Sequence, residues 1–290
     1  MNRPANAELN ATVRMLVVNA REDLIPILPQ NICHAQVNVQ HVRGVNQACE
    51  RLKQETFEVV IADIDIPTTG SVDLLRSLYD ASPEAKVIVV SSGRSPSVMA
   101  DLLRERAYSI LLRPVVVGRL AEVVEHAIAS RDWRDEIRII SGAPSWIQVE
   151  IRCKLSAAER AVLIFRESPG SLESQEHDEL TTAFREMLMN AIEHGGRSDP
   201  NQSIFVSMVW SKRSLMFYIR DPGEGFSMQH LPHAAISNPD GVLEHAEVRE
   251  QKGIRPGGFG ILLARNLVDE LIYSERGNEV ILIKYRQQHR

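Results

Sequence analysis

The first half of the chain repeatedly changes its hydrophobic period, and this change limits the folds it can adopt. Short runs rich in β-branched residues, typical of buried strands, occur at 15–18, 59–63, 86–90 and 109–112, with a weaker candidate at 35–40. Helix-like stretches separate these runs. Near-continuous apolar strands suit a parallel sheet covered by helices on both faces. The pattern predicts an α/β, flavodoxin-like doubly wound domain over 13–130, with its site at the carboxyl ends of the strands.

Polar residues at the ends of these runs resemble the phosphoacceptor site of response-regulator receiver domains. The segment ADIDIP at 62–67 places Asp63 at the position of the phosphorylated aspartate. Ser91 stands where receivers carry a Thr or Ser, and Arg113 stands where they carry the Lys of Lys-Pro. The resemblance implies that Asp63 is a phosphoacceptor candidate, assisted by Ser91 and Arg113.

Two departures from the receiver pattern affect this interpretation. Receivers place two acidic residues that hold Mg²⁺ after the first strand, whereas this chain has Asn19 and Ala20. At most Asp63 and Asp65 remain as anionic ligands, too few for the usual carboxylate-rich Mg²⁺ pocket. Arg113 also exchanges a compact ammonium for a planar guanidinium. The domain is either a phosphorylated receiver or a pseudo-receiver that contacts partners without chemistry, and the missing acids favour the second.

The ends of this domain are predicted from composition. Residues 1–12 contain no apolar signal-peptide core and are expected to form a disordered leader. RDWRDEIRII is charged and amphipathic enough to form a linker helix, which SGAPS then breaks with turn-forming residues. We therefore expect 131–145 to connect the first domain to a second one over 146–290.

The second half has a different pattern, in which helices are grouped against alternating strands. Strand-like segments occur at 146–155, 203–210, 214–221 and 279–285, and helix-like segments at 157–167 and 172–196. Helices packed on one antiparallel sheet form an α+β two-layer sandwich. We predict this fold for residues 146–290.

A polar stripe on the longer helix is the first of three motifs in this half. Glu186, Asn190 and His194 follow one another at intervals of four residues, so they share one face of the helix. An Asn oxygen is a suitable hard ligand for Mg²⁺. A carboxylate one turn away could orient or deprotonate an attacking hydroxyl. Such a stripe on its own is more often a solvated helix face.

The other two motifs are rich in glycine. In RDPGEGF at 220–226, Asp221 can accept a hydrogen bond from an exocyclic amine such as that of adenine, and the glycines allow close approach of a flat ring. In RPGGFGILLARNLVDEL at 255–271, the glycines precede a helix whose first amides would face a phosphate chain. Each motif alone is a common turn.

Together and in this order, the three motifs resemble the N box and the two glycine boxes of the GHKL ATPase and kinase superfamily, and most of all its anti-sigma-factor serine kinases. The resemblance implies a Bergerat-type ATP pocket, with Asn190 on Mg²⁺, Asp221 on the adenine amine and Glu186 as general base. The three motifs extend the expected nucleotide site to further residues, which are His194, Gly223, Gly225, Gly257, Gly258, Phe259 and Gly260. Arg255, like Arg249 and Lys252, could reach the γ-phosphate as a charge clamp. The roughly 30 residues between Phe226 and Gly257 are expected to form a mobile ATP lid.

Composition restricts the partners. The net charge is −5 without a basic block, which argues against electrostatically driven nucleic-acid binding. No apolar run approaches the roughly 18 residues of a membrane span. Three scattered cysteines suit a reduced, cytoplasmic protein. We expect protein partners, no nucleic acid and no membrane.

The expected function is partner-switching signalling by an ATP-dependent serine/threonine protein kinase under the control of a receiver domain. Its partner would be a sigma factor or an antagonist protein. The amphipathic segment at 131–140, together with the resemblance, suggests a homodimer. One alternative is a nucleotide-gated protein-binding module without phosphotransfer. The other is an atypical histidine kinase, which is weaker because only His126 lies on a suitable helix ahead of the ATPase half, and that helix face is expected to be exposed.

Overall fold

A computed structural model describes residues 12–21, 23–28, 36–64, 70–93, 95–167, 172–226 and 260–286 of the chain. It forms two compact units, Met1–Arg134 and Asp135–Arg290, and each is described by itself. Among the described residues, no helix combines the length and the apolar character needed to cross a membrane. Of the leader predicted at 1–12, residues 1–11 lie outside the described part, and Thr12 begins the first strand.

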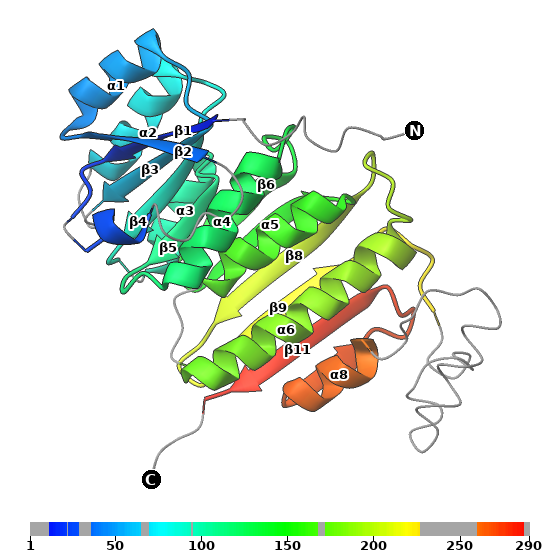
Figure 1. Ribbon diagram of the computed structural model, residues 1–290. Coiled ribbons are helices and arrows are strands. Elements are labelled where there is room, and N and C mark those ends of the chain that lie inside the picture. Colours follow the sequence, from blue (N-terminus) through cyan, green and yellow to red (C-terminus); the bar gives the residue numbers. More distant parts are fainter. Residues whose placement is uncertain are drawn as a thin grey trace, which may run out of the picture. The chain divides into compact units, whose positions relative to one another are not determined.

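The first unit contains a five-stranded parallel sheet in the order β2-β1-β3-β4-β5 (Figure 1). The strands are β1 (Thr12–Val18), β2 (Gln36–Val42), β3 (Val59–Ile64), β4 (Lys86–Ser91) and β5 (Ser109–Leu112). The helices are α1 (Val45–Gln54), α2 (Gly70–Ala81), α3 (Pro96–Arg104) and α4 (Val117–Ala129), with a 3-10 turn η1 (Ile25–Ile27). Every residue of β3 is buried, as a central strand covered on both faces requires. The predicted doubly wound fold is confirmed.

A buried polar network holds the end of α4 in this unit. The Lys86 ammonium donates hydrogen bonds to the carbonyls of Ala127 (2.6 Å) and Ser130 (2.5 Å), at the end of the helix. The last carbonyl groups of a helix have no hydrogen-bond donor within the helix, so a cation that binds them stabilises the helix end. The hydroxyl of the fully buried Tyr108 lies 2.6 Å from Nδ1 of His126 and 2.8 Å from Oγ of Ser130. His126 is therefore half-buried and hydrogen-bonded, and the expectation of an exposed position is wrong.

The second unit contains a six-stranded antiparallel sheet in the order β10-β11-β9-β8-β7-β6. Its strands are β6 (Ile137–Ala143), β7 (Trp146–Arg152), β8 (Ser203–Trp210), β9 (Ser214–Arg220), β10 (Glu270–Tyr273) and β11 (Glu279–Tyr285). The helices α5 (Leu155–Arg166), α6 (Ser174–Asn190) and α8 (Gly260–Leu267) lie on one face of the sheet (Figure 1). The predicted two-layer sandwich is confirmed.

Alternation along the strands places an aromatic cluster between the two layers. Leu215, Phe217 and Ile219 of β9 are buried, while the residues between them are more exposed. The ring of Phe217 stacks on Phe184 of α6 at 4.2 Å between centroids and meets the edge of Phe165 of α5 at 5.9 Å. Aromatic pairs of this kind add to the energy of apolar burial. This cluster fixes α6, and with it the first motif, against the sheet.

The linker helix predicted within 131–145 is wrong, because Ile137–Ala143 forms the strand β6. Ile137 and Ile139 pair with Ile151 and Val149 of β7, and the register shifts between Ile139 and Ser141. This β-bulge breaks the two-residue alternation, which is why the sequence pattern could be taken for an amphipathic helix. Of the predicted break at 141–145, the first three residues belong to β6 and the last two form the turn of a β-hairpin. The second unit begins at Asp135 instead of 146.

Candidate functional site

A cavity of about 510 Å³ lies in the second unit, between α6, the end of β9 and the start of α8. Residues from all three sequence motifs line it. They are Asn190 and His194 from the first, Asp221, Gly223 and Gly225 from the second, and Gly260 from the third. These motifs lie far apart in the chain, and the antiparallel sheet with its helices brings them to one place.

Asp221 immediately follows β9 and is held tightly within the cavity. Its backbone N–H donates to the carbonyl of Asn278 at 3.0 Å, and its Oδ1 accepts a hydrogen bond from the Gly223 amide at 2.8 Å. A Cβ added at Gly195 would lie 2.2 Å from Cγ of Asp221, so only a glycine leaves room for this carboxylate. Burial raises the pKa of the Asp221 carboxyl, and the Gly223 hydrogen bond opposes this effect.

Two tight turns meet beside Asp221 and need glycines for packing reasons. Gly225 has a φ of 83°, and a Cβ there would lie 1.9 Å from the carbonyl oxygen of Arg276. Gly277 has a φ of 80°, and its Cβ would lie 2.0 Å from the carbonyl oxygen of Phe226. The sequence predicts that Gly225 allows close approach of a flat ring. In the structure it lines the cavity, but the neighbouring turn is what requires a glycine there.

The first motif lies where α6 ends and passes into a π-helical turn, η2 (Ala191–Gly195). Such turns inside or at the end of helices are frequent at functional sites. Asn190 and the exposed His194 line the cavity. Glu186 is not among its described lining residues, but a Cβ at Gly260 would lie 2.8 Å from Oε2 of Glu186 and 3.5 Å from Nδ2 of Asn190. The first turn of α8 therefore sits directly against Glu186 and Asn190.

Part of the predicted nucleotide site lies outside the described residues. Arg255, Gly257, Gly258 and Phe259 lie outside the described residues, as does the predicted lid between Phe226 and Gly257. Of the glycines in the third motif, the structure describes Gly260. The phosphate-loop role of the others stays a prediction.

Two lining residues that none of the sequence motifs indicates come from the end of β10 and from the turn before β11. Tyr273, at the end of β10, donates its hydroxyl hydrogen to Sδ of Met187 at 3.1 Å and meets the ring of Phe226 edge-on at 5.4 Å. Asn278 is buried, and its Nδ2 lies 3.4 Å from the backbone oxygen of Asp221. The pattern of the short segment ELIY could have indicated Tyr273, because alternation places it on the same side of the strand as Leu271.

The arrangement suits a ligand with a flat polar ring and an anionic tail. The lining of the cavity combines the Asp221 carboxylate, apolar side chains, the Asn190 amide and the start of α8. Within the described residues, no group of three or more His, Cys, Asp or Glu side chains could hold a metal ion. A cation here would thus depend on Asn190 together with oxygens of the ligand, which is how Mg²⁺ commonly binds.

The strand ends of the first unit hold a different, strongly paired site. The Asp63 side chain is 2% exposed, and its carboxylate forms an ion pair with Arg113, whose guanidinium also pairs with Asp23. The backbone N–H of Arg21 donates to Oδ2 of Asp63 at 3.0 Å. Ser91 ends the neighbouring strand β4, and its hydroxyl accepts a hydrogen bond from the amide of Gly93. Asp65 lies outside the described residues.

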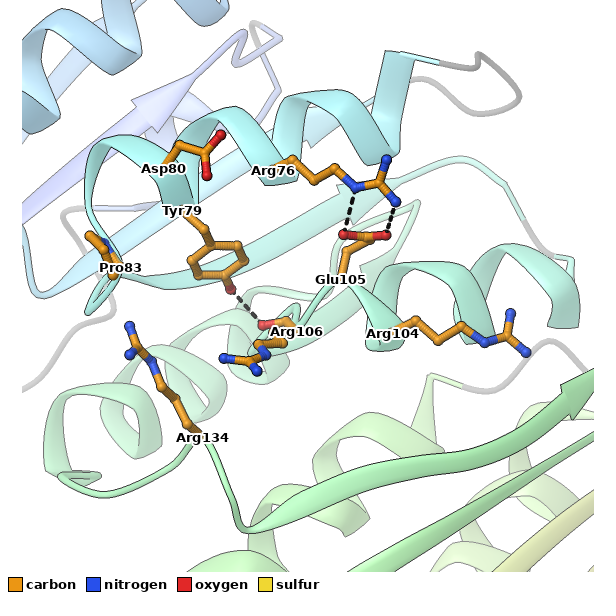
Figure 2. Close-up of a pocket in the computed structure, with 8 residues that line it drawn as sticks. All are labelled: Arg76, Tyr79, Asp80, Pro83, Arg104, Glu105, Arg106 and Arg134. Atoms are coloured by element: carbon orange, nitrogen blue, oxygen red, sulfur yellow. Dashed lines mark hydrogen bonds and ion pairs between the residues drawn. The ribbon is translucent and has the colours of Figure 1, made fainter.

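A second cavity of about 300 Å³ lies on the first unit, beside the ends of α2 and α3 (Figure 2). Arg76 makes two hydrogen bonds to Glu105, and the Tyr79 hydroxyl donates to the carbonyl of Arg106. Arg134 pairs with Glu84 at 2.9 Å. Because acids match these arginines, their positive charge is largely neutralised within the protein. We assign this cavity no ligand.

Comparisons with known families match both units. Residues 148–284 match the histidine kinase-like ATPase domain, and residues 15–125 match the response regulator receiver domain. The second half is similar to the anti-sigma F factor of Anoxybacillus flavithermus, with 30% identity over 114 residues that cover 37% of this chain and 70% of that protein.

The first half is similar to the response regulator protein PilR of Pseudomonas aeruginosa, with 25% identity over 119 residues. The match covers 41% of this chain and only 27% of PilR, so the chain spans about a quarter of that relative. A response regulator structure from Thermotoga maritima is matched over 41% of this chain and 100% of that chain, at 22% identity and a TM-score of 0.38.

Proposed function

We propose that this chain, which belongs to the family of histidine kinase-like ATPases that includes the anti-sigma F factor, is an ATP-dependent serine/threonine protein kinase. It carries a response-regulator receiver domain ahead of its ATPase domain, and we place it in partner-switching signalling. The observation that carries this proposal is the convergence of Asn190, Asp221 and Gly260 on one cavity. Its partner would be a sigma factor or an antagonist protein.

Each end of the cavity has a role in holding ATP. Asp221 accepts a hydrogen bond from the exocyclic amine of adenine through a carboxylate that Gly223 and Gly195 position. The start of α8 at Gly260 directs its amides toward the phosphates. Asn190 would hold Mg²⁺, which neutralises charge on the phosphate chain.

The transfer step needs a base near the phosphate end, and Glu186 supports that role by its position beside Gly260 and Asn190. A serine or threonine hydroxyl of the partner attacks the γ-phosphorus as the bond to the β-phosphate oxygen breaks. Glu186 takes the hydroxyl proton, and ADP leaves. The product is a phosphate ester on the partner.

A binding-module function has one observation in its favour. Glu186 is outside the described lining of the cavity, and its Oε1 lies 3.5 Å from Nη1 of Arg185. A carboxylate held there would leave ATP bound without transfer, and ATP would then act by ordering a surface for a partner. A histidine kinase is disfavoured, because His126 is half-buried and bonded to Tyr108.

The test separates binding from transfer. The full chain is titrated with ATP, with and without Mg²⁺, and incubated with γ-labelled ATP and candidate antagonist proteins. We expect Glu186→Gln to bind Mg·ATP normally and to lose phosphorylation of the partner. Glu193→Gln, an exposed acid of the adjacent π-turn, is the matched control and should keep both. Normal binding without transfer or hydrolysis by the unmodified protein would replace the kinase with the binding module.

We propose that the receiver domain regulates this kinase without phosphorylation of Asp63. Support comes from Arg113, whose guanidinium already compensates the buried carboxylate. Labelling by acetyl phosphate that disappears in Asp63→Asn would overturn this proposal and make Asp63 a phosphoacceptor. A homodimer and a cytoplasmic location complete the proposal, and sedimentation and cell fractionation test them.

A further inference from the structure

Tyr273 contributes a hydroxyl group to the lining of the proposed nucleotide cavity. It ends the edge strand β10 and pairs with Val280 of β11. The preceding residue, Ile272, faces away from the helices and is 45% exposed, whereas Tyr273 turns inward and lines the cavity. Among the lining residues that the structure describes, Tyr273 alone carries a hydroxyl group. Its ring is fixed by the edge-on contact with Phe226.

The present partner of that hydroxyl is a weak one. It donates to the thioether sulfur of Met187, at 3.1 Å. A thioether accepts hydrogen bonds poorly, so an incoming ring nitrogen would be a better acceptor. Burial raises the pKa of the Tyr273 phenol, and the charge of Asp221 raises it further. The phenol therefore stays protonated and remains a donor.

Asp221 and Tyr273 supply a hydrogen-bond acceptor and a hydrogen-bond donor to the lining of one cavity, and the charge of Asp221 acts on the Tyr273 phenol. The edge of adenine that carries its amine has the opposite pattern, with the amine as donor and the adjacent ring nitrogen N1 as acceptor. Guanine has an acceptor oxygen and an N1–H donor at the same positions. With guanine, an acceptor oxygen would therefore face the Asp221 carboxylate, and the N1–H donor would face the Tyr273 hydroxyl donor. Both mismatches leave buried polar groups without hydrogen bonds.

We propose that Tyr273 is a base-specificity residue, whose hydroxyl leaves Met187 and donates to N1 of adenine while Asp221 accepts from the amine. The inference rests on the proposed function, since it takes ATP as the nucleotide. The hydrogen bond from Tyr273 to N1 would be a second base contact beside that of Asp221, and it would select against guanine.

The test pairs a residue change with a change in the ligand. Tyr273→Phe keeps the ring and its contact with Phe226 and removes the hydroxyl. The probes are ATP, GTP and 1-deaza-ATP, in which a C–H replaces N1. We expect Tyr273→Phe to weaken ATP roughly two- to tenfold, the range of one net hydrogen bond. The unmodified protein should lose a similar factor with 1-deaza-ATP, and Tyr273→Phe should bind the two adenine nucleotides equally. The preference for ATP over GTP should shrink in the variant.

Tyr218→Phe, on the side of β9 away from the buried residues, is the matched control and should bind all three as the unmodified protein does. Thermal unfolding checks that both variants fold. Unchanged ATP affinity and an unchanged ATP-to-GTP ratio in Tyr273→Phe would overturn this inference alone, as would an equal loss with 1-deaza-ATP in both proteins. Absence of ATP binding by the unmodified protein would overturn the proposed function and this inference with it.

Discussion

Substitution of Gly195 tests the proposed contact between Asp221 and adenine, because the missing side chain of this glycine leaves room for the Asp221 carboxylate. In Gly195→Ala the new Cβ would lie 2.2 Å from Cγ and Oδ1 of Asp221 and 2.5 Å from its Cβ. Real Cβ contacts essentially never fall below 3.0 Å, so the Asp221 side chain must move. The carboxylate then leaves the position that the Gly223 amide gives it.

The size of the effect follows from the interaction that is lost. A hydrogen bond to a charged group contributes about 1.5–3 kcal/mol, which corresponds to a roughly 10- to 150-fold weaker ATP complex. The fold should change much less, since alanine is about 0.5–1 kcal/mol better than glycine within a helix and offsets part of the strain. We therefore predict a large loss of affinity with a small change in melting temperature.

The neighbouring glycine is a matched control for this prediction. A Cβ at Gly196 would lie 2.2 Å from Sγ of the buried Cys153, away from the lining of the cavity. Gly196→Ala should cost about 1–3 kcal/mol of unfolding free energy through overpacking and leave ATP affinity unchanged. Adding Cys153→Ala should restore part of that stability.

Calorimetric titration with Mg·ATP, together with thermal unfolding of the same samples, measures both effects. If Gly195→Ala folds normally and binds ATP as tightly as the unmodified protein, the assignment of Asp221 to the adenine amine fails. Equal losses of affinity in Gly195→Ala and Gly196→Ala would show that distortion of the π-turn, and not displacement of Asp221, causes the effect.

Three further predictions concern charges. Arg113→Ala should lower the unfolding free energy of the receiver domain by about 3–5 kcal/mol in urea denaturation, because the Asp63 carboxylate stays buried without its partner; a loss below about 1 kcal/mol would contradict the pairing. The contribution of Asp221 to ATP affinity should be fully present above its raised pKa and should fall as the pH drops through it, since the ionised carboxylate is the stronger acceptor for the amine. That fall should begin at a higher pH than the ordinary value of 3.8 suggests, and a pH series of titrations in which affinity rises on acidification would refute it. Lys86→Met should cost about 1.5–3 kcal/mol in the same urea experiment, because the last carbonyls of α4 lose a charged donor; an unchanged midpoint would count against that role.

The sequence predicted the elements whose pattern is uninterrupted. The runs that became β3 and β4 each contain four successive apolar residues, at 59–62 and 87–90, and the strand β9 alternates cleanly. β6 was missed because a bulge after Ile139 interrupts its alternation. A local pattern contains no information on such an irregularity, since the partner strand β7 determines it.

The site was predictable where a residue's role depends on a local motif. Asn190 and Asp221 were found in this way, and both line the cavity. Tyr273 was missed because its place in the cavity depends on the packing of β10 beside α6, which no motif records. The pairing of Arg113 with Asp23 was likewise invisible, since it joins two loops that only the parallel sheet brings together.

The chemical stability of the transferred phosphate tests the central claim most directly. The protein is incubated with γ-labelled Mg·ATP and a candidate antagonist, and the labelled proteins are separated and treated with acid or alkali. We predict label on the partner that resists acid and is lost in alkali, as a serine or threonine phosphate is, and none with Asn190→Ala. Acid-labile label on the chain itself, or no transfer although Mg·ATP binds, would contradict a kinase that phosphorylates a protein hydroxyl.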